Sequence, residues 1–169
     1  ITHGNSGYLT FFRNYSSSQF ASPIVWNDPA TQQTAAVGTM VFDGGDIGMN
    51  VVGNVLGAAT AGTSVATASY DSSSTDVAGI YVLGLGGAGL GDVAATSLFR
   101  TGNYDYFNKK VMWQSGTAVT LPSSLYLSSQ PTWWPPGTPW PWVGPDLSPM
   151  VGTLPAKARS DSKYSPPTP

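Results

Sequence analysis

Apolar and polar residues follow one another in short blocks along the chain, with no sustained helical period. Each apolar block is rich in β-branched or aromatic residues and is bounded by Gly, Asn, Asp or Ser, which is typical of strands between turns. The predicted strands lie within residues 7–15, 37–42, 47–56, 79–85, 94–100, 104–113 and 121–128. The pattern therefore predicts an all-β protein with many turns.

Several of these blocks are apolar throughout instead of alternating, as in Gly79–Leu85 (GIYVLGL). Continuous apolar strands suit burial on both faces, which is usual in parallel sheets. The segments between them, above all 16–34 and 57–76, are rich in Ser, Thr, Ala and Gly and predict loop excursions, not crossover helices. Parallel strands joined by loops are typical of solenoids, so we predict a right-handed parallel β-helix (a β-solenoid) over residues 1–130.

A weak internal repeat agrees with stacked turns. The dipeptide Gly-Asn occurs at 4–5, 53–54 and 102–103, each 49 residues after the last. Glycine permits the backbone of a tight corner, and asparagine tolerates a left-handed backbone and can hydrogen-bond along a stack of equivalent corners. The spacing predicts that these corners lie above one another.

Residues 131–146 hold four of the six Trp and six of the fourteen Pro. Proline donates no hydrogen bond, so this segment cannot form a central strand. We predict that residues 131–155 form a Pro/Trp-rich C-terminal cap over the exposed end of the sheets, followed by a polar, loosely held tail at 156–169. The alternative is a polysaccharide-binding platform, in which aromatic faces contact sugar rings. The rings concerned are Trp133, Trp134, Trp140 and Trp142.

Charged residues make up 9% of the chain, against about 25% in a typical globular domain. There are nine Asp, no Glu and seven Lys plus Arg, so the net charge is −2. A chain without a basic patch is not expected to bind nucleic acid or an anionic membrane. Apolar runs stay well short of the ~18 residues of a membrane span, so no membrane insertion is expected. There are no cysteines, which removes disulfides and thiolate chemistry.

Candidate chemistry is sparse. Asp43 and Asp46 flank a Gly-Gly turn and could hold Ca²⁺ or act as an acid–base pair, although a solvated turn is the favoured interpretation. His3 is the single histidine and no Gly-x-Ser-x-Gly motif is present. Arg13 and Arg100 precede corners or turns and are expected to cap carbonyls there. We assign no catalytic residue and no cofactor besides a possible Ca²⁺.

Five short motifs carry a resemblance to a known family. They are Thr10–Tyr15 (TFFRNY), Asn50–Gly57 (NVVGNVLG), Thr101–Tyr106 (TGNYDY), Leu121–Ser129 (LPSSLYLSS) and Leu154–Arg159 (LPAKAR). In this order they resemble the C-terminal portion of secreted bacterial right-handed parallel β-helix proteins of the pectate-lyase-like superfamily. The resemblance implies an extracellular or cell-surface location. It also implies a longer parent chain, consistent with a first residue, Ile1, that is not an initiator Met.

The family hosts several functions, so the resemblance leaves the activity open. We expect a non-catalytic extracellular structural or adhesive module, part of a larger protein or assembly, which could bind polysaccharide. The apolar run Tyr8–Phe12 is expected to be covered by upstream coils or by a neighbouring subunit. The alternatives are a polysaccharide lyase or glycosidase acting in a groove, and a component of a viral or cell-surface fibre.

Overall fold

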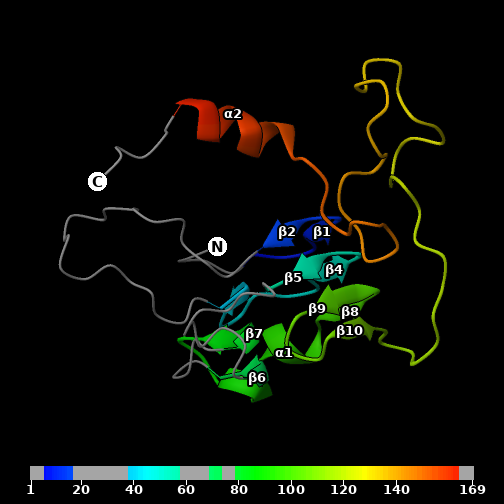
Figure 1. The fold of residues 1–169 in the computed structure, drawn as a ribbon. Coiled ribbons are helices and arrows are strands. Elements are labelled where there is room, and N and C mark those ends of the chain that lie inside the picture. The colour runs from blue at the N-terminus through cyan, green and yellow to red at the C-terminus, as the bar shows by residue number, and fades with distance from the viewer. Residues whose placement is uncertain (1–5, 17–37, 58–68, 74–78, 164–169) are drawn as a thin grey trace.

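The computed structural model describes residues 6–16, 38–57, 69–73 and 79–163 (Figure 1). Most of its regular structure is strand. The strands are β1 (Thr10–Phe12), β2 (Tyr15–Ser16), β3 (Met40–Asp43), β4 (Asn50–Val52), β5 (Val55–Leu56), β6 (Ser69–Ser72), β7 (Gly79–Leu85), β8 (Phe99–Thr101), β9 (Asn103–Asp105) and β10 (Lys110–Met112). The helical elements are the 3₁₀ turn η2 (Gly89–Gly91), α1 (Val93–Thr96) and α2 (Pro155–Lys163).

The prediction of a right-handed parallel β-helix is wrong. The described strands form three short separate sheets, ordered β1-β4-β8, β10-β9-β5-β2 and β3-β7-β6. The first and third are parallel, whereas the second is mixed because β10 runs antiparallel to β9. No sheet closes and no continuous coil runs through the described residues, because η2 and α1 separate β7 from β8 and β10 turns back on β9.

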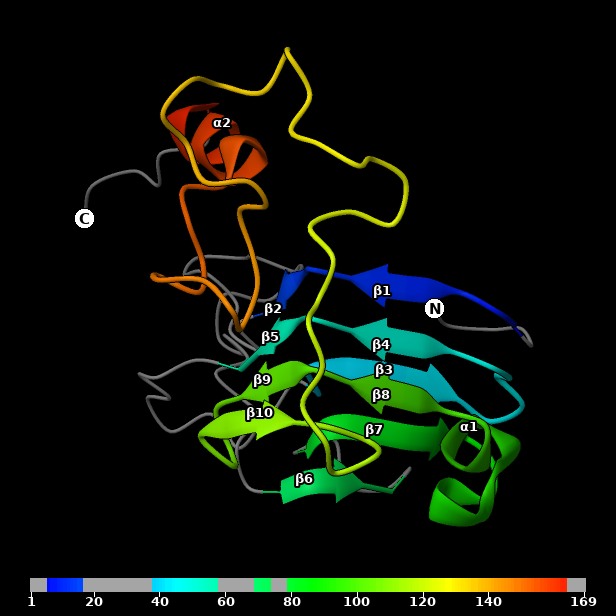
Figure 2. The same ribbon diagram turned by 90° about the vertical axis from the view of Figure 1, so that its right-hand side faces the viewer.

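Three strand pairs are nevertheless stacked in parallel register, and we call them tiers. Tier one is β1–β2, tier two is β4–β5 and tier three is β8–β9 (Figure 2). Phe11, Val51 and Arg100 are register partners across the first sheet. Met40 and Asp71 are the register partners of the central Tyr81 across the third sheet. These two columns point into the core between the sheets.

The core lies where the middle members of the columns meet. Val51, Leu56 and Tyr81 have no exposed surface, and they pack with other buried apolar side chains of β3, β7 and α1. At the tier-one end of the columns, Phe11 and Met40 are half-buried and pack against this core. Most strands therefore contribute only a few side chains to this core, whereas β7 is buried along nearly all of its length.

Some predicted elements differ from the structure. The predicted strand at 94–100 begins with α1, because Asp92 accepts a hydrogen bond from the Ala94 N–H (2.9 Å) and so caps a helix. The predicted strand at 121–128 is irregular and pairs with no strand among the described residues. The predicted loop at 57–76 contains β6, and the polar tail forms α2. Most of the 16–34 excursion lies outside the described residues.

The Pro/Trp-rich segment, predicted as a C-terminal cap, runs from tier three toward tier one. After β10, the chain leaves tier three, runs along the outside of the sheets and rises beyond β1 and β2, where α2 follows (Figures 1 and 2). We call residues 121–151 the return segment. Because its polar anchor is in tier one, it spans the tiers instead of closing the last one.

The corners between the two strands of each tier require a left-handed backbone. Arg13, Gly53 and Gly102 hold this position, with φ of 53°, 66° and 63°. A Cβ added to Gly102 would lie 2.8 Å from Leu121 Cδ2 and 2.9 Å from the Trp113 ring. Gly116 has a comparable φ of 74° but open space around it.

We therefore predict that Gly102→Ala is much more destabilising than Gly116→Ala. Both variants bear the left-handed backbone cost of about 1 kcal/mol, but only Gly102→Ala also displaces packed side chains, for a total of roughly 3 kcal/mol. Urea unfolding of the two variants measures the difference. Equal losses of stability would show that the Gly102 corner is not packed as described.

Candidate functional site

An asparagine ladder links the corners of the three tiers. Asn54 Oδ1 accepts hydrogen bonds from the Asn14 N–H (2.8 Å) and from Asn14 Nδ2 (3.2 Å). Asn103 Oδ1 accepts the same pair of bonds from Asn54, both at 2.9 Å. Each lower Nδ2 also donates to a backbone carbonyl in the tier above, Asn54 to Phe11 at 2.9 Å and Asn103 to Val51 at 2.7 Å. Asn54 and Asn103 are buried, so these bonds satisfy amide groups that water does not reach.

The ladder is in part the repeat seen in the sequence. Gly53-Asn54 and Gly102-Asn103 stack directly, which confirms that these two corners lie above one another. The third rung is Asn14, which follows an arginine and so escaped the Gly-Asn pattern. Asn5, the third predicted member, lies outside the described residues.

The two ends of the ladder differ. Below Asn103, β10 pairs with β9 and places Met112 opposite Asn103, which closes that end. At the other end Asn14 is exposed, and among the described residues its Oδ1 accepts no hydrogen bond. The ladder therefore ends in an acceptor at the outer edge of tier one.

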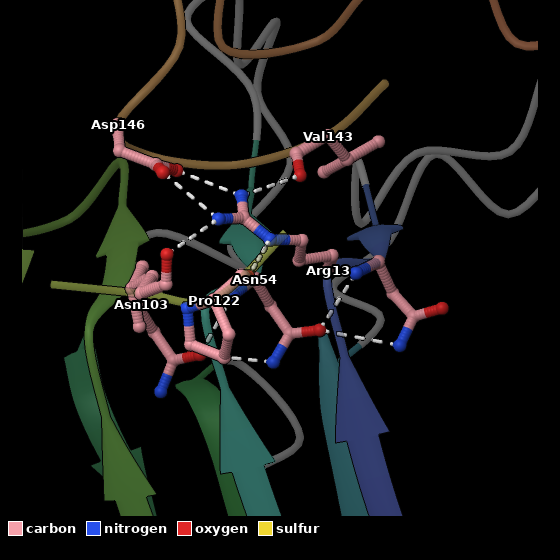
Figure 3. Close-up of polar contacts among 8 residues, drawn as sticks. Arg13, Asn54, Asn103, Pro122, Val143 and Asp146 are labelled. Carbon is pink, nitrogen blue, oxygen red and sulfur yellow. Dashed lines mark hydrogen bonds and ion pairs between the residues drawn. The ribbon is translucent and has the colours of Figure 1, made fainter. Parts of the chain in front are cut away.

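Arg13 fastens the return segment beside this rung (Figure 3). Its Nε donates to the Pro122 carbonyl at 2.9 Å, and Nη1 and Nη2 donate to the Val143 carbonyl at 3.1 Å and the Leu121 carbonyl at 3.4 Å. The two remaining donors bind the Asp146 carboxylate at 2.7 and 2.8 Å. All five N–H donors of the guanidinium are thus used, and only 5% of the side chain is exposed. Arg13 therefore binds carbonyls, but they belong to residues more than 100 positions away and not, as expected, to its own corner.

The electrostatics of this contact favour the charged pair. The side-chain hydrogen bonds from Arg13, followed by its charge, lower the pKa of Asp146 despite partial burial. A guanidinium that forms a parallel two-point contact with a carboxylate fixes the direction of both groups. Asp146 therefore fixes the position of the return segment as well as balancing the charge of Arg13.

Three of the four predicted tryptophans are half-buried within the returning chain. Trp134 stacks on Trp142 at 3.7 Å between ring centroids, and Trp134 Nε1 donates to the Pro139 carbonyl at 3.1 Å. The ring centroids of Trp133 and Trp134 lie 5.7 Å apart, and Trp133 remains 72% exposed, whereas Trp140 is half-buried. The stack stabilises the segment itself. Contact with a polysaccharide, through Trp133 above all, stays a prediction.

The predicted cation pair Asp43 and Asp46 belongs to a turn in which one carboxylate faces inward. Asp46 is fully buried and accepts from the Ser6 N–H at 2.8 Å and the Asp43 N–H at 3.1 Å. The Asp92 carboxylate lies against the same turn and accepts from the Gly45 N–H at 2.8 Å. The described residues contain no group of three or more His, Cys, Asp or Glu side chains suited to a metal ion. The geometry of Asp46 favours a structural turn.

A charged cluster lies at the tier-three end of the inward columns. Arg100 forms a two-point ion pair with Asp71, and its guanidinium lies 4.6 Å from the Tyr70 ring centroid and 4.7 Å from that of Tyr81. Burial raises the pKa of Tyr70 to about 12 and also raises the pKa of Tyr81. Burial likewise raises the pKa of Asp105, which accepts hydrogen bonds from Asn108. The tyrosines therefore remain neutral, and the arginine closes the core with a charge.

A shallow pocket of about 450 Å³ lies between the return segment and the outer side of the second sheet. Tyr15, Tyr106 and residues 147–151 line it, and the side chains are aromatic, apolar or hydroxyl-bearing. Its lining holds no carboxylate, histidine or lysine that could transfer a proton at neutral pH. Within the described ranges, no helix is both long and apolar enough to cross a membrane.

Comparisons with known proteins add no relative: no protein-family model, no curated protein and no solved structure matches the chain. The resemblance to the pectate-lyase-like superfamily therefore stays a prediction. The proposals below depend on the geometry of the described residues.

We predict that Arg13→Lys destabilises the protein by about 2–3 kcal/mol. Lysine keeps the charge but cannot satisfy three carbonyls and a carboxylate from one planar group, so buried acceptors lose their partners. Urea unfolding monitored by tryptophan fluorescence measures the loss. Arg159→Lys, at an exposed position of α2, is the matched control and should change stability by less than about 0.5 kcal/mol. Equal stability of the two variants would contradict the anchoring role of Arg13.

We also predict that Asp146 contributes to acid sensitivity. Its pKa is below the ordinary value of 3.8, so its contribution to stability is complete above that value and is lost as the pH falls through the lowered pKa. Asp146→Asn should be less stable than the wild type near neutral pH, and the gap should narrow between about pH 5 and pH 2. Urea midpoints over this range provide the measurement. Asp92, whose pKa is also lowered, is present in both proteins and cancels in the comparison. A gap independent of pH would refute the assignment.

Proposed function

We propose that this chain is a non-catalytic structural module that adds its strands to a further tier of parallel strands at the outer edge of tier one. One observation carries this proposal: the inward columns are apolar at the tier-one end and charged at the tier-three end. Phe11 and Met40 stand at the first end, and Arg100 and Asp71 stand at the same register positions at the other. An apolar, half-buried end suits continued packing, and a charged end suits termination.

The positions of the edge strands also favour the tier-one end as the site of strand addition. β1, β2 and β3 are each the outermost strand of their sheet, and they all lie on the tier-one side. Next to β1, Tyr8 is 77% exposed and Leu9 is 40% exposed. Exposed edge strands offer backbone N–H and C=O groups to an extended segment, while the neighbouring apolar side chains add buried area.

The charged tier-three end argues against head-to-tail stacking of identical copies. Such stacking would bring the Arg100–Asp71 pair onto Phe11 and Met40, and burying a charged pair against apolar side chains is costly. The partner is therefore a polypeptide whose own inward residues are apolar, either strands of a longer chain or a neighbouring subunit. A fibre of repeated identical contacts is correspondingly disfavoured.

The catalytic alternative has less support from the geometry. The Asp46 carboxylate is occupied by two backbone N–H groups, and Asp71 is paired with Arg100. A glycosidase needs one carboxyl group free to donate a proton and another free to attack or to activate water. An extracellular, adhesive role is proposed from the sequence, and the two ends of the structure are compatible with it.

Self-association of the isolated chain tests the proposal. Because Tyr8 and Leu9 are exposed at this edge, the wild-type protein should show sedimentation coefficients that rise with concentration. Phe11→Asp should abolish the rise by placing a charge in the inward column. Phe99→Asp is the matched control, because Phe99 is 43% exposed, faces outward and lies on the opposite edge, so association should persist. Phe11→Asp could fail to fold because Phe11 packs on the core, so Leu9→Lys is a second test at an exposed edge position. Leu9→Lys should stay folded and should also abolish association. A wild-type protein that stays monomeric up to high concentration would overturn the proposal.

A further inference from the structure

The asparagine ladder specifies what kind of strand the outer edge of tier one accepts. In both observed steps the upper asparagine donates its backbone N–H and its Nδ2 to Oδ1 of the asparagine below. In both steps the lower Nδ2 donates to the carbonyl that stands three residues before the upper asparagine, Phe11 for Asn14 and Val51 for Asn54. Each step is thus a pattern of three hydrogen bonds, and the second step repeats the first without change.

Asn14 carries the two groups that the lower asparagine supplies in each step, an Oδ1 acceptor and an Nδ2 donor, at the outer edge of tier one. Its Oδ1 is an acceptor with no donor among the described residues, on an exposed side chain. Its Nδ2 donates to Asn54 Oδ1 and retains a second hydrogen, which in Asn54 is the one given to the carbonyl above. Both groups that would receive a further rung are therefore in place at Asn14.

We infer that Asn14 is a recognition residue for a parallel strand–corner–strand segment with an asparagine at its corner. The segment carries an apolar residue three positions before that asparagine and another two positions after it, as Val51 and Leu56 stand around Asn54 in tier two. The first apolar residue packs on Phe11, the asparagine N–H and Nδ2 bind Asn14 Oδ1, and Asn14 Nδ2 binds the carbonyl three residues earlier. The ladder thus selects both the partner sequence and its register.

Register selection by a side chain is needed at this edge. A strand shifted by one residue would turn its apolar side chains away from Phe11, yet the backbone ladder alone tolerates such shifts. An asparagine that accepts two bonds from one partner residue penalises every register but one. This inference rests on the proposed strand addition and adds the identity of the partner segment to it.

A synthetic peptide copying tier two, Ile47–Gly57 (IGMNVVGNVLG), is the probe. Titrated into the isotope-labelled full chain, it should shift the amide resonances of Phe11, Asn14 and Tyr15 and give a dissociation constant. The peptide variant Asn54→Ala should bind about fivefold more weakly, since it keeps its backbone N–H but loses the Nδ2 hydrogen bond of about 1 kcal/mol to Asn14 Oδ1. The matched peptide variant Asn50→Ala changes an outward asparagine and should bind like the parent peptide.

The variant Asn14→Ala in the protein should weaken binding of the parent peptide by at least this factor, because it removes the Oδ1 acceptor and the Nδ2 donor together. It keeps the N–H that binds Asn54 Oδ1, so its spectrum should remain that of a folded chain. Combining Asn14→Ala with the Asn54→Ala peptide should weaken binding no further than Asn14→Ala alone, because the contact that the peptide change removes is already lost.

Three results would overturn the inference: no binding of the parent peptide, equal binding by Asn14→Ala, or independent, additive losses in the combined experiment. Failure here differs from failure of the proposed function. If the isolated chain self-associates through Phe11 but the peptide results go against Asn14, the edge joins strands without selecting an asparagine corner. If the isolated chain remains monomeric, both proposals fall.

Discussion

Stacking of the corners in register is the constraint on which the other features depend. The strands of each tier are short, and strands of two or three residues have little hydrogen-bonding energy of their own. Asn54 and Asn103 compensate by joining backbone and side-chain groups of adjacent tiers inside the protein. Once the corners at 13–14, 53–54 and 102–103 coincide, the residues three before each asparagine must also coincide. The inward column of Phe11, Val51 and Arg100 follows directly.

The same corner positions the return segment. Because Arg13 occupies the left-handed position that glycine holds in the other two tiers, it has a side chain where they have none. That side chain donates hydrogen bonds to three carbonyls and a carboxylate of residues 121–146, which fixes these residues against the first tier. The segment that leaves tier three is thus fixed at tier one, and the tiers are held from outside as well as through the core.

The two ends of the columns give the molecule a direction. At the tier-three end, the charged pair and the tyrosines with raised pKa values end the inward columns, and the antiparallel strand β10 covers β9. At the tier-one end, apolar side chains, strand edges and an asparagine Oδ1 that accepts no hydrogen bond from the described residues coincide. The proposed function follows from this asymmetry. A module with one charged end and one apolar end suits the terminal position in a larger stack of strands.

The sequence predicted a good part of the strands but not their assembly. Gly79–Leu85 was assigned in full, because a continuous apolar run bounded by turn residues is a local signal. The 49-residue spacing identified two rungs of the ladder, since glycine is needed wherever the corner is closely packed. The third rung was missed because Arg13 adopts the glycine conformation, and nothing local reveals that. The predicted overall fold was wrong because the positions of β10, α1 and the return segment depend on contacts between distant residues. The bond from Arg13 to Asp146 spans 133 positions.

Amide hydrogen exchange at Asn14 tests the ladder most directly. Asn14 is exposed, so its backbone N–H would exchange rapidly unless Asn54 Oδ1 holds it as described. The account predicts slow exchange for the Asn14 N–H in the wild type and rapid exchange in Asn54→Ala, with the protein still folded. Rapid exchange in the wild type, or protection that survives removal of Asn54, would contradict the stacking of corners on which the account depends.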